Sequence, residues 1–194
     1  MHAWFAHIPG LKVVIPSTPY DAKGLLKTAI RDDNPVLFFE HKAMYSMRGY
    51  VPPEEYTIPF GVADVKREGR DLTIVAIGRM VHVALEAAQQ LAELGIEAEV
   101  IDPRTLVPLD RETLIESARK TGRVIILDEG HQSYGVTAEL ASVITEGAFY
   151  YLDAPVVRMG AMDVPVPFSP PLEDLTVPTS ERVVETAKAL CGRA

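Results

Sequence analysis

Two carboxylates and an imidazole follow one strand-like segment of this chain. Asp128, Glu129 and His131 come directly after the run RVIIL at residues 123–127. Such a group could bind a metal ion, contact a ribose or transfer a proton. The alternative is that Asp128 and Glu129 cap the next helix or lie in a subunit interface. We favour this alternative because no second cluster at metal-ligand spacing supports a site.

Two other strand-like segments also end in polar residues, at Gly78-Arg79 and at Asp102. Open parallel sheets bind ligands at the carboxyl ends of their strands, so these residues are candidate ligand-binding positions. The stretch AIGRMVHVA has one glycine where a dinucleotide-binding fingerprint needs three. The chain also lacks a P-loop, a Gly-x-Ser-x-Gly elbow and a paired-histidine zinc motif. By themselves, these residues predict a fold and no particular reaction.

Composition narrows the range of partners. The chain has 194 residues, 47% of them hydrophobic, and a formal net charge of −8. Its Lys and Arg residues are scattered, so we expect no nucleic-acid partner. The single Cys191 cannot form an internal disulfide, which favours a reducing, cytoplasmic location. No apolar run approaches the roughly 20 residues of a membrane helix, and the amino terminus lacks signal-peptide features.

The first part of the chain predicts a strand, a helix and a strand. The strands are expected at Leu11–Ile15 and Val36–Glu40. Thr18 is a good N-cap and Pro19 suits the first helical position. One apolar helical stripe follows, formed by Ala22, Leu25, Leu26, Ala29 and Ile30. His2, next to the amino terminus, is expected to be disordered.

Residues 46–70 are rich in proline, glycine and charge, and they predict a linker. Strands and helices then alternate regularly. Strands are expected at residues 72–78, 96–102, 123–130 and 154–160, and helices at 81–95, 109–122, around 136–144 and at 180–192. This alternation predicts an α/β fold with an open, mostly parallel sheet and helices on both faces.

Five strings of the sequence resemble a known family, and they occur in the family's order. They are AWFAHIPGLKVVIPSTPYDAKGLL, AIRDDNPVLFFEHK, VIDPRTLVPLD, KTGRVIILDEG and YLDAPVVRMGAMDVPVPFSPPLE. The chain resembles the carboxyl-terminal part of the beta subunit of the E1 component of 2-oxoacid dehydrogenase complexes. These include the pyruvate, branched-chain 2-oxoacid and acetoin enzymes. The resemblance covers essentially the whole chain.

The resemblance implies three regions. Residues 1–45 would be the incomplete tail of a pyrimidine-binding-type domain, residues 46–70 a linker, and residues 71–194 a transketolase C-terminal-like domain. It also implies thiamine diphosphate with Mg²⁺ as cofactors of the intact heterotetramer. The family's catalytic histidine and cofactor-binding glutamate would lie before Met1, so no catalytic or cofactor-binding residue is assigned here. We therefore expect a fragment or a late start.

A monovalent-cation site is implied at one helix end. In the family, potassium is held by backbone carbonyls and an Asp/Asn pair, which match Ala29, Ile30, Asp32 and Asn34. Carbonyls at a helix carboxyl end carry partial negative charge, which suits a hard cation. The alternative is that RDDNP simply ends the helix.

Three functions remain open. The first is an E1 beta part that serves mainly subunit assembly and E2 docking, with an E1 alpha subunit, a second beta subunit and the E2 acyltransferase as partners. The 2-oxoacid substrate is not specified by these residues. The second is a stand-alone, noncatalytic interaction module of the same family. The third is a nucleotide-binding regulator that uses Asp128 and Glu129.

Overall fold

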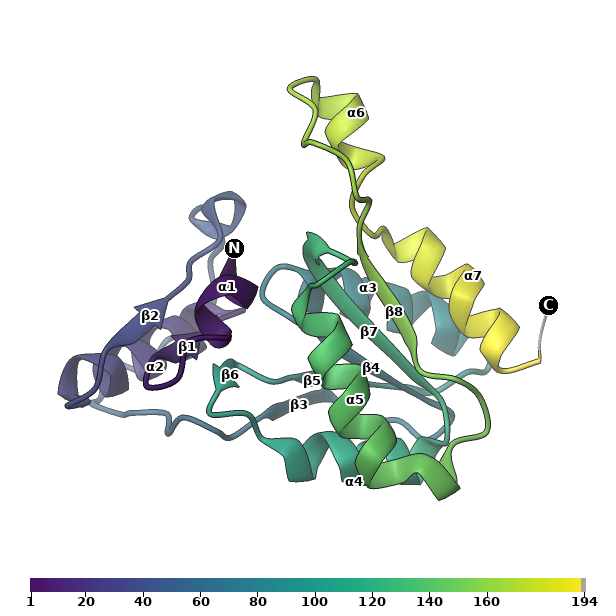
Figure 1. Cartoon of the computed structure of the whole chain (residues 1–194), viewed down its shortest axis with the longest axis horizontal. Helices are drawn as coiled ribbons and strands as arrows, with labels where there is room; N and C mark the ends of the chain where they lie inside the picture. Colours follow the sequence, from purple (N-terminus) through teal and green to yellow (C-terminus); the bar gives the residue numbers. More distant parts are fainter. Residues whose placement is uncertain (193–194) are drawn as a thin grey trace.

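The computed structural model describes residues 1–192, which contain two sheets (Figure 1). The smaller sheet has the order β2-β1-β6. Its central strand β1 (Lys12–Val14) runs parallel to β2 (Val36–Phe38) and antiparallel to β6 (Thr105–Val107). Because β6 comes from the later part of the sequence, the two halves of the chain share this sheet.

Helix α2 (Pro19–Arg31) connects β1 to β2. Its start follows from the local sequence, because Thr18 Oγ1 accepts a hydrogen bond from the Asp21 amide at 3.1 Å. The helix packs against Tyr56 and Ile58, which lie in the predicted linker. A Cβ atom on Gly24 would lie 2.6 Å from Ile58 Cγ1, so glycine is needed for this approach.

The larger sheet has the order β3-β5-β4-β7-β8. Its strands are β3 (Asp64–Arg67), β4 (Leu72–Ala76), β5 (Ala98–Asp102), β7 (Val124–His131) and β8 (Val157–Ala161). All neighbours are parallel except β3, which pairs antiparallel with β5. Every residue of β4 and β5 is buried, as expected for parallel strands covered on both faces.

Four helices cover the larger sheet. Helices α3 (Met80–Glu93) and α7 (Ser180–Leu190) contribute to the core on one face, and α4 (Arg111–Thr121) and α5 (Val136–Ala148) to the core on the other (Figure 1). The prediction of an open, mostly parallel sheet with helices on both faces is confirmed. Within residues 1–192, no helix is both long and apolar enough to cross a membrane.

Several short elements were not predicted. They are α1 (His2–Ala6), β3, β6, the single-turn helices η1 (Lys42–Met44) and η2 (Phe149–Tyr151), and α6 (Pro170–Asp174). Strand β3 lies inside the predicted linker 46–70. Its sequence DVKR carries no apolar alternation, and its backbone pairs with β5 instead. The domain boundaries themselves remain a prediction.

Candidate functional site at the junction of the two sheets

The strand ends of the two sheets meet at a small polar cavity. It has a volume of about 110 Å³, and its lining includes residues that follow β1, β2 and β4 and two residues of β7, Asp128 and Glu129. Its polar side chains are His2, Glu40, His41, Arg79, Asp128 and Glu129. This is where a ligand site is expected in a parallel α/β sheet.

The polar groups at this junction bind one another. His2 Nε2 lies 2.9 Å from Asp128 Oδ2, and His41 Nε2 lies 2.8 Å from Glu129 Oε2. Arg79 Nη1 lies 2.8 Å from Glu129 Oε1. The acids of β7 therefore hold side chains of the first 41 residues against the larger sheet. Their clearest chemical role in this arrangement is mutual charge compensation.

Two sequence expectations need correction here. Asp128 and Glu129 do not cap the next helix, because α5 follows Gly135 with no side-chain cap hydrogen bond. Both acids lie more than five residues before the start of α5, and they contact His2, His41 and Arg79 instead. His2 is not disordered: it begins α1 and contacts the buried Asp128. This contact of 2.9 Å anchors the amino terminus.

A second polar cluster is buried between the sheets. Lys66 Nζ lies 2.7 Å from Asp21, 2.6 Å from Asp64 and 3.7 Å from Asp102. Arg104 also contacts Asp21 at 2.9 Å and Asp64 at 2.7 Å. Two cations thus face three carboxylates. The cluster joins α2 to β3 and to the end of β5, so it ties the first half of the chain to the second.

Burial and pairing shift the pKa values of this cluster in opposite directions. Burial raises the pKa of Asp102 to about 6, although a hydrogen bond from Ser17 and the charge of Lys66 oppose the shift. Burial also acts to raise the pKa of Asp21, but hydrogen bonds from Lys66 and Thr18 outweigh it and lower the pKa. Asp102 is therefore the carboxyl of this cluster that takes up a proton most readily. Once Asp102 is protonated, two cations face two carboxylates.

The residues of the implied potassium site lie together at the end of α2. The Asp32 carboxylate is bound by the Lys12 ammonium and, at 2.9 Å, by the Asn34 side-chain amide. The Lys12 hydrogen bond is the main reason that the pKa of Asp32 falls to about 2. The Ala29 carbonyl accepts a hydrogen bond from the Asp32 amide, and Ile30 is exposed. The Asp32 carboxylate could therefore serve as a ligand of a cation only if the contact between Lys12 and Asp32 opens.

Among residues 1–192, no group of three or more His, Cys, Asp or Glu side chains is placed to hold a metal ion. His131, which the sequence grouped with Asp128 and Glu129, lies elsewhere. Its Nδ1 donates to the Met162 carbonyl at 2.8 Å.

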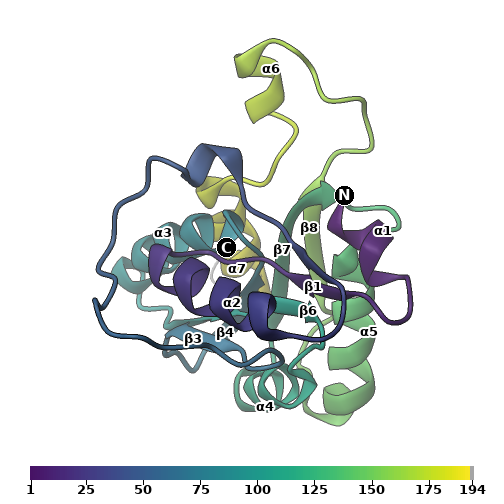
Figure 2. The same ribbon diagram turned by 90° about the vertical axis from the view of Figure 1, so that its left-hand side faces the viewer.

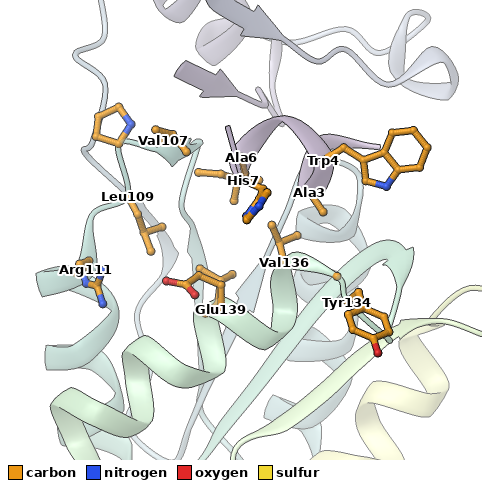
Figure 3. A pocket seen from close by; sticks show the side chains of 14 residues that line it. Ala3, Trp4, Ala6, His7, Val107, Leu109, Arg111, Tyr134, Val136 and Glu139 are labelled. Atoms are coloured by element: carbon orange, nitrogen blue, oxygen red, sulfur yellow. The ribbon is translucent and has the colours of Figure 1, made fainter. Parts of the chain in front are cut away.

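A larger cavity, of about 920 Å³, lies between α1, the segment after β6 and the start of α5 (Figure 3). Its lining is mainly apolar, with His7, Arg111, Tyr134 and Glu139 as polar members. Trp4 and Tyr134 lie on one side of it and are exposed, and Arg111 and Glu139 lie on the other (Figure 3).

Comparison with known proteins places this architecture in a class. Residues 61–183 match the transketolase C-terminal domain, and residues 1–47 match the transketolase pyrimidine-binding domain. The chain belongs to the transketolase C-terminal domain family. The families matched are those of thiamine-diphosphate enzymes.

The similar curated proteins are E1 beta subunits. The chain is 51% identical to the acetoin:2,6-dichlorophenolindophenol oxidoreductase subunit beta of Bacillus subtilis (strain 168), over 99% of this chain and 56% of that protein. It is 52% identical to the pyruvate dehydrogenase E1 component subunit beta of the same organism, over 94% of this chain and 56% of that protein. The chain thus spans little more than half the length of these relatives, and it corresponds to their carboxyl-terminal part.

A solved structure described as a split-gene transketolase, inactive beta4 tetramer, is similar to this chain in fold. It is 31% identical, with a TM-score of 0.77, and the match covers 98% of this chain and 60% of that chain. A transketolase from Pichia stipitis, 17% identical with a TM-score of 0.63, shares the fold.

Sequence reasoning missed most partners in the two polar clusters. Lys66 lies in the predicted linker, and Arg104 follows β5 in a left-handed conformation with φ of 59°. A non-glycine residue in this region is uncommon, and its ion pairs with Asp21 and Asp64 offset the strain. No sequence signal marks Arg104. Arg104 lies in the short connection between β5 and β6, and a charged residue in such a connection is too common to be diagnostic.

Proposed function

We propose that this chain is the carboxyl-terminal part of an E1 beta subunit of a thiamine-diphosphate-dependent 2-oxoacid dehydrogenase complex. The single observation that supports this most is identity of 47–52% to E1 beta subunits over 94–99% of the chain. The intact enzyme would decarboxylate a 2-oxoacid and pass the acyl group to the lipoyl arm of E2. Mg²⁺ would bind with the cofactor diphosphate.

Within that enzyme, the described residues would serve assembly more than chemistry. Their polar clusters are occupied by internal ion pairs, which leaves little for a substrate. The partners would be an E1 alpha subunit, a second beta subunit and the E2 acyltransferase. The division into residues 1–45, 46–70 and 71–194 belongs to this proposal, as does a cytoplasmic location. Among the relatives, some are named as mitochondrial.

The experiment is a titration of the purified 194-residue chain with thiamine diphosphate and Mg²⁺, alone and with an E1 alpha subunit of the same organism. We expect the alpha subunit to bind the chain, and the chain alone neither to bind the cofactor tightly nor to release carbon dioxide from a 2-oxoacid. Carbon dioxide release by the chain alone would overturn the assignment of an assembly role.

A second candidate is a stand-alone, noncatalytic interaction module. It is favoured by one specific observation: the solved relative with a TM-score of 0.77 is described as inactive and as a beta4 tetramer. This candidate predicts that the chain binds its partners with the same affinity whether or not thiamine diphosphate is present. An E1 beta part predicts tighter assembly in the presence of the cofactor.

Potassium remains the proposed ligand of Ala29, Ile30, Asp32 and Asn34, in competition with Lys12. The test is thermal unfolding of the wild type and of Lys12→Met in matched KCl and choline chloride. Stabilisation by KCl that becomes larger in Lys12→Met supports the site. Equal melting temperatures in both salts for both proteins would exclude it.

A further inference from the structure

The segment between β8 and α7 projects from the body of the protein as an arm, which we define as residues 162–176 (Figures 1 and 2). Its two ends lie side by side, because the Met162 amide donates to the Thr176 carbonyl at 2.9 Å. The loop after β7 holds this neck, since Ser133 Oγ donates to Asp163 Oδ2 at 2.5 Å. The arm therefore starts from a fixed base.

The large apolar side chains of the arm are exposed and are not covered by the rest of the described chain. Phe168 is 103% exposed, and no residue of α6 is buried. The other large apolar residues of the arm are each at least 39% exposed: Met162, Val164, Val166, Leu172 and Leu175. Six exposed large apolar side chains within the 15 residues of the arm indicate an interaction surface, whereas single exposed apolar residues do not.

The arm is also stiff. Prolines stand at positions 165, 167, 170 and 171, on both sides of Phe168. Alternating and paired prolines restrict the backbone to extended conformations, and α6 adds a helical turn whose Leu172 and Glu173 amides donate to the Ser169 carbonyl. A preorganised element loses little conformational entropy when it binds. The arm thus combines an aromatic anchor with a backbone that is already ordered.

The charge of the arm indicates what kind of partner it fits. Residues 159–181 contain no Lys, Arg or His, and the arm itself carries Asp163, Glu173 and Asp174. The whole chain has a formal net charge of −8. A second copy would bring more negative charge to the contact, which electrostatics disfavours. A groove with Lys and Arg at its rim would be complementary.

We infer that the arm is a docking element that inserts Phe168 into an apolar, basic-rimmed groove on a different protein chain. This inference rests on the proposed function, in which that chain is the E1 alpha subunit. Aromatic side chains at the centre of an interface carry much of its binding energy. The acidic residues of the arm would steer the encounter and make it salt-dependent.

The test measures the affinity of the full chain for the E1 alpha subunit by calorimetry. Phe168→Ser is expected to weaken binding at least tenfold. The matched control is Tyr150→Ser, which removes an aromatic ring that is 94% exposed on η2, outside the arm. It should change affinity less than twofold. Because both rings are exposed, circular dichroism and melting temperature should match the wild type for both variants.

The charge argument has its own variant, Glu173→Gln combined with Asp174→Asn. It should weaken binding several-fold at low salt, and the difference should vanish near 0.5 M NaCl, where screening is short-ranged. Wild-type affinity for Phe168→Ser would overturn the inference and leave the proposed function intact. Failure of the wild type to bind the alpha subunit would overturn both. A changed oligomeric state of Phe168→Ser alone, by sedimentation, would identify a second copy as the occupant and also overturn it.

Discussion

The hydroxyl of Ser17 donates a hydrogen bond to the buried carboxyl of Asp102, across 85 residues of sequence. Ser17 follows β1 of the small sheet, and Asp102 ends β5 of the large one. The contact therefore crosses the junction between the two halves of the chain. Because Asp102 is fully buried, its protonation state contributes directly to the stability of that junction.

Stability should fall as pH rises through the titration of Asp102. Its folded-state pKa of about 6 exceeds the unfolded value of 3.8, so the folded protein holds the proton more tightly. The shift of about two units corresponds to about 3 kcal/mol, lost between about pH 4 and pH 6. Asp102→Asn should lack this loss. Denaturant unfolding at pH 4.5 and 7.5 should record about two-thirds of this loss.

Asp32→Asn is the matched control, since its carboxyl has the opposite shift. Its pKa is lowered to about 2, so its contribution is present above about pH 4 and disappears as pH falls through 2. The variant should leave the decrease between pH 4.5 and 7.5 unchanged. If Asp102→Asn keeps the full decrease, another group is responsible for it.

Removal of the Lys66 ammonium should destabilise the fold strongly. Lys66→Met would leave the carboxylates of Asp21 and Asp102 buried without their nearest cation. Breaking a buried pair from one side typically costs about 3–5 kcal/mol. The measurement is the free energy of unfolding in urea at pH 7.

A double-mutant cycle supplies the control. Adding Asp21→Asn to Lys66→Met removes one of the two buried carboxylates that lose this cation and should recover part of the loss. Strictly additive effects would show that the contact between Lys66 and Asp21 contributes nothing to stability.

Loss of the Glu129 charge should loosen the first 41 residues from the larger sheet. Glu129→Gln removes the carboxylate that contacts His41 and Arg79 and should cost about 1–2 kcal/mol, because these groups are only partly buried. Hydrogen exchange should become faster at α1 and β2. The exposed Glu86→Gln on α3 is the control and should leave both unchanged.

The same residues test the nucleotide-binding alternative. Replacement of both Asp128 and Glu129 by Ala should abolish nucleotide binding if these acids hold a ribose. Binding of a nucleotide by the wild type, lost in the double variant, would support that function against the assembly role.

Gly24→Ala should destabilise the protein although alanine favours helices. The new Cβ would lie 2.6 Å from Ile58 Cγ1 and 2.9 Å from Tyr56 Cε2, so α2 or the segment beyond it must shift. The helix gains about 1 kcal/mol from alanine and loses about 1–3 kcal/mol from overpacking. A net loss of stability in urea unfolding is expected. Lys27→Ala on the same helix should change stability by less than about 0.5 kcal/mol, and a stabilised Gly24→Ala would contradict the close contact.

Elements with strong local signals were predictable from the sequence. Helix α2 begins after Thr18 and α4 after Asp110, and both side chains accept the capping hydrogen bond that their types indicate. Strand β4 is apolar except for Thr73, and β7 begins with the apolar run Val124–Leu127, which favours burial on both faces. In these cases the decisive interactions lie within a few residues of one another.

Strands β3 and β6 were not predictable in this way. Each is short, and each forms because a distant edge offers its backbone a partner: β5 for one and β1 for the other. Propensity contributes little where pairing across the fold decides. The acids at the end of β7 were recognised from their position, but their partners His2 and His41 were not, since more than 80 residues separate them.

The sequence by itself determined the α/β class, the main helices and strands, and the family resemblance, because these depend on local pattern and on ordered motifs. Only the tertiary structure decided that β6 joins the first sheet, that Lys66 and Arg104 bridge buried carboxylates, and that residues 162–176 project from the body. Ion pairing and strand addition depend on distance in space, and a linear pattern carries no information on which distant residues become neighbours.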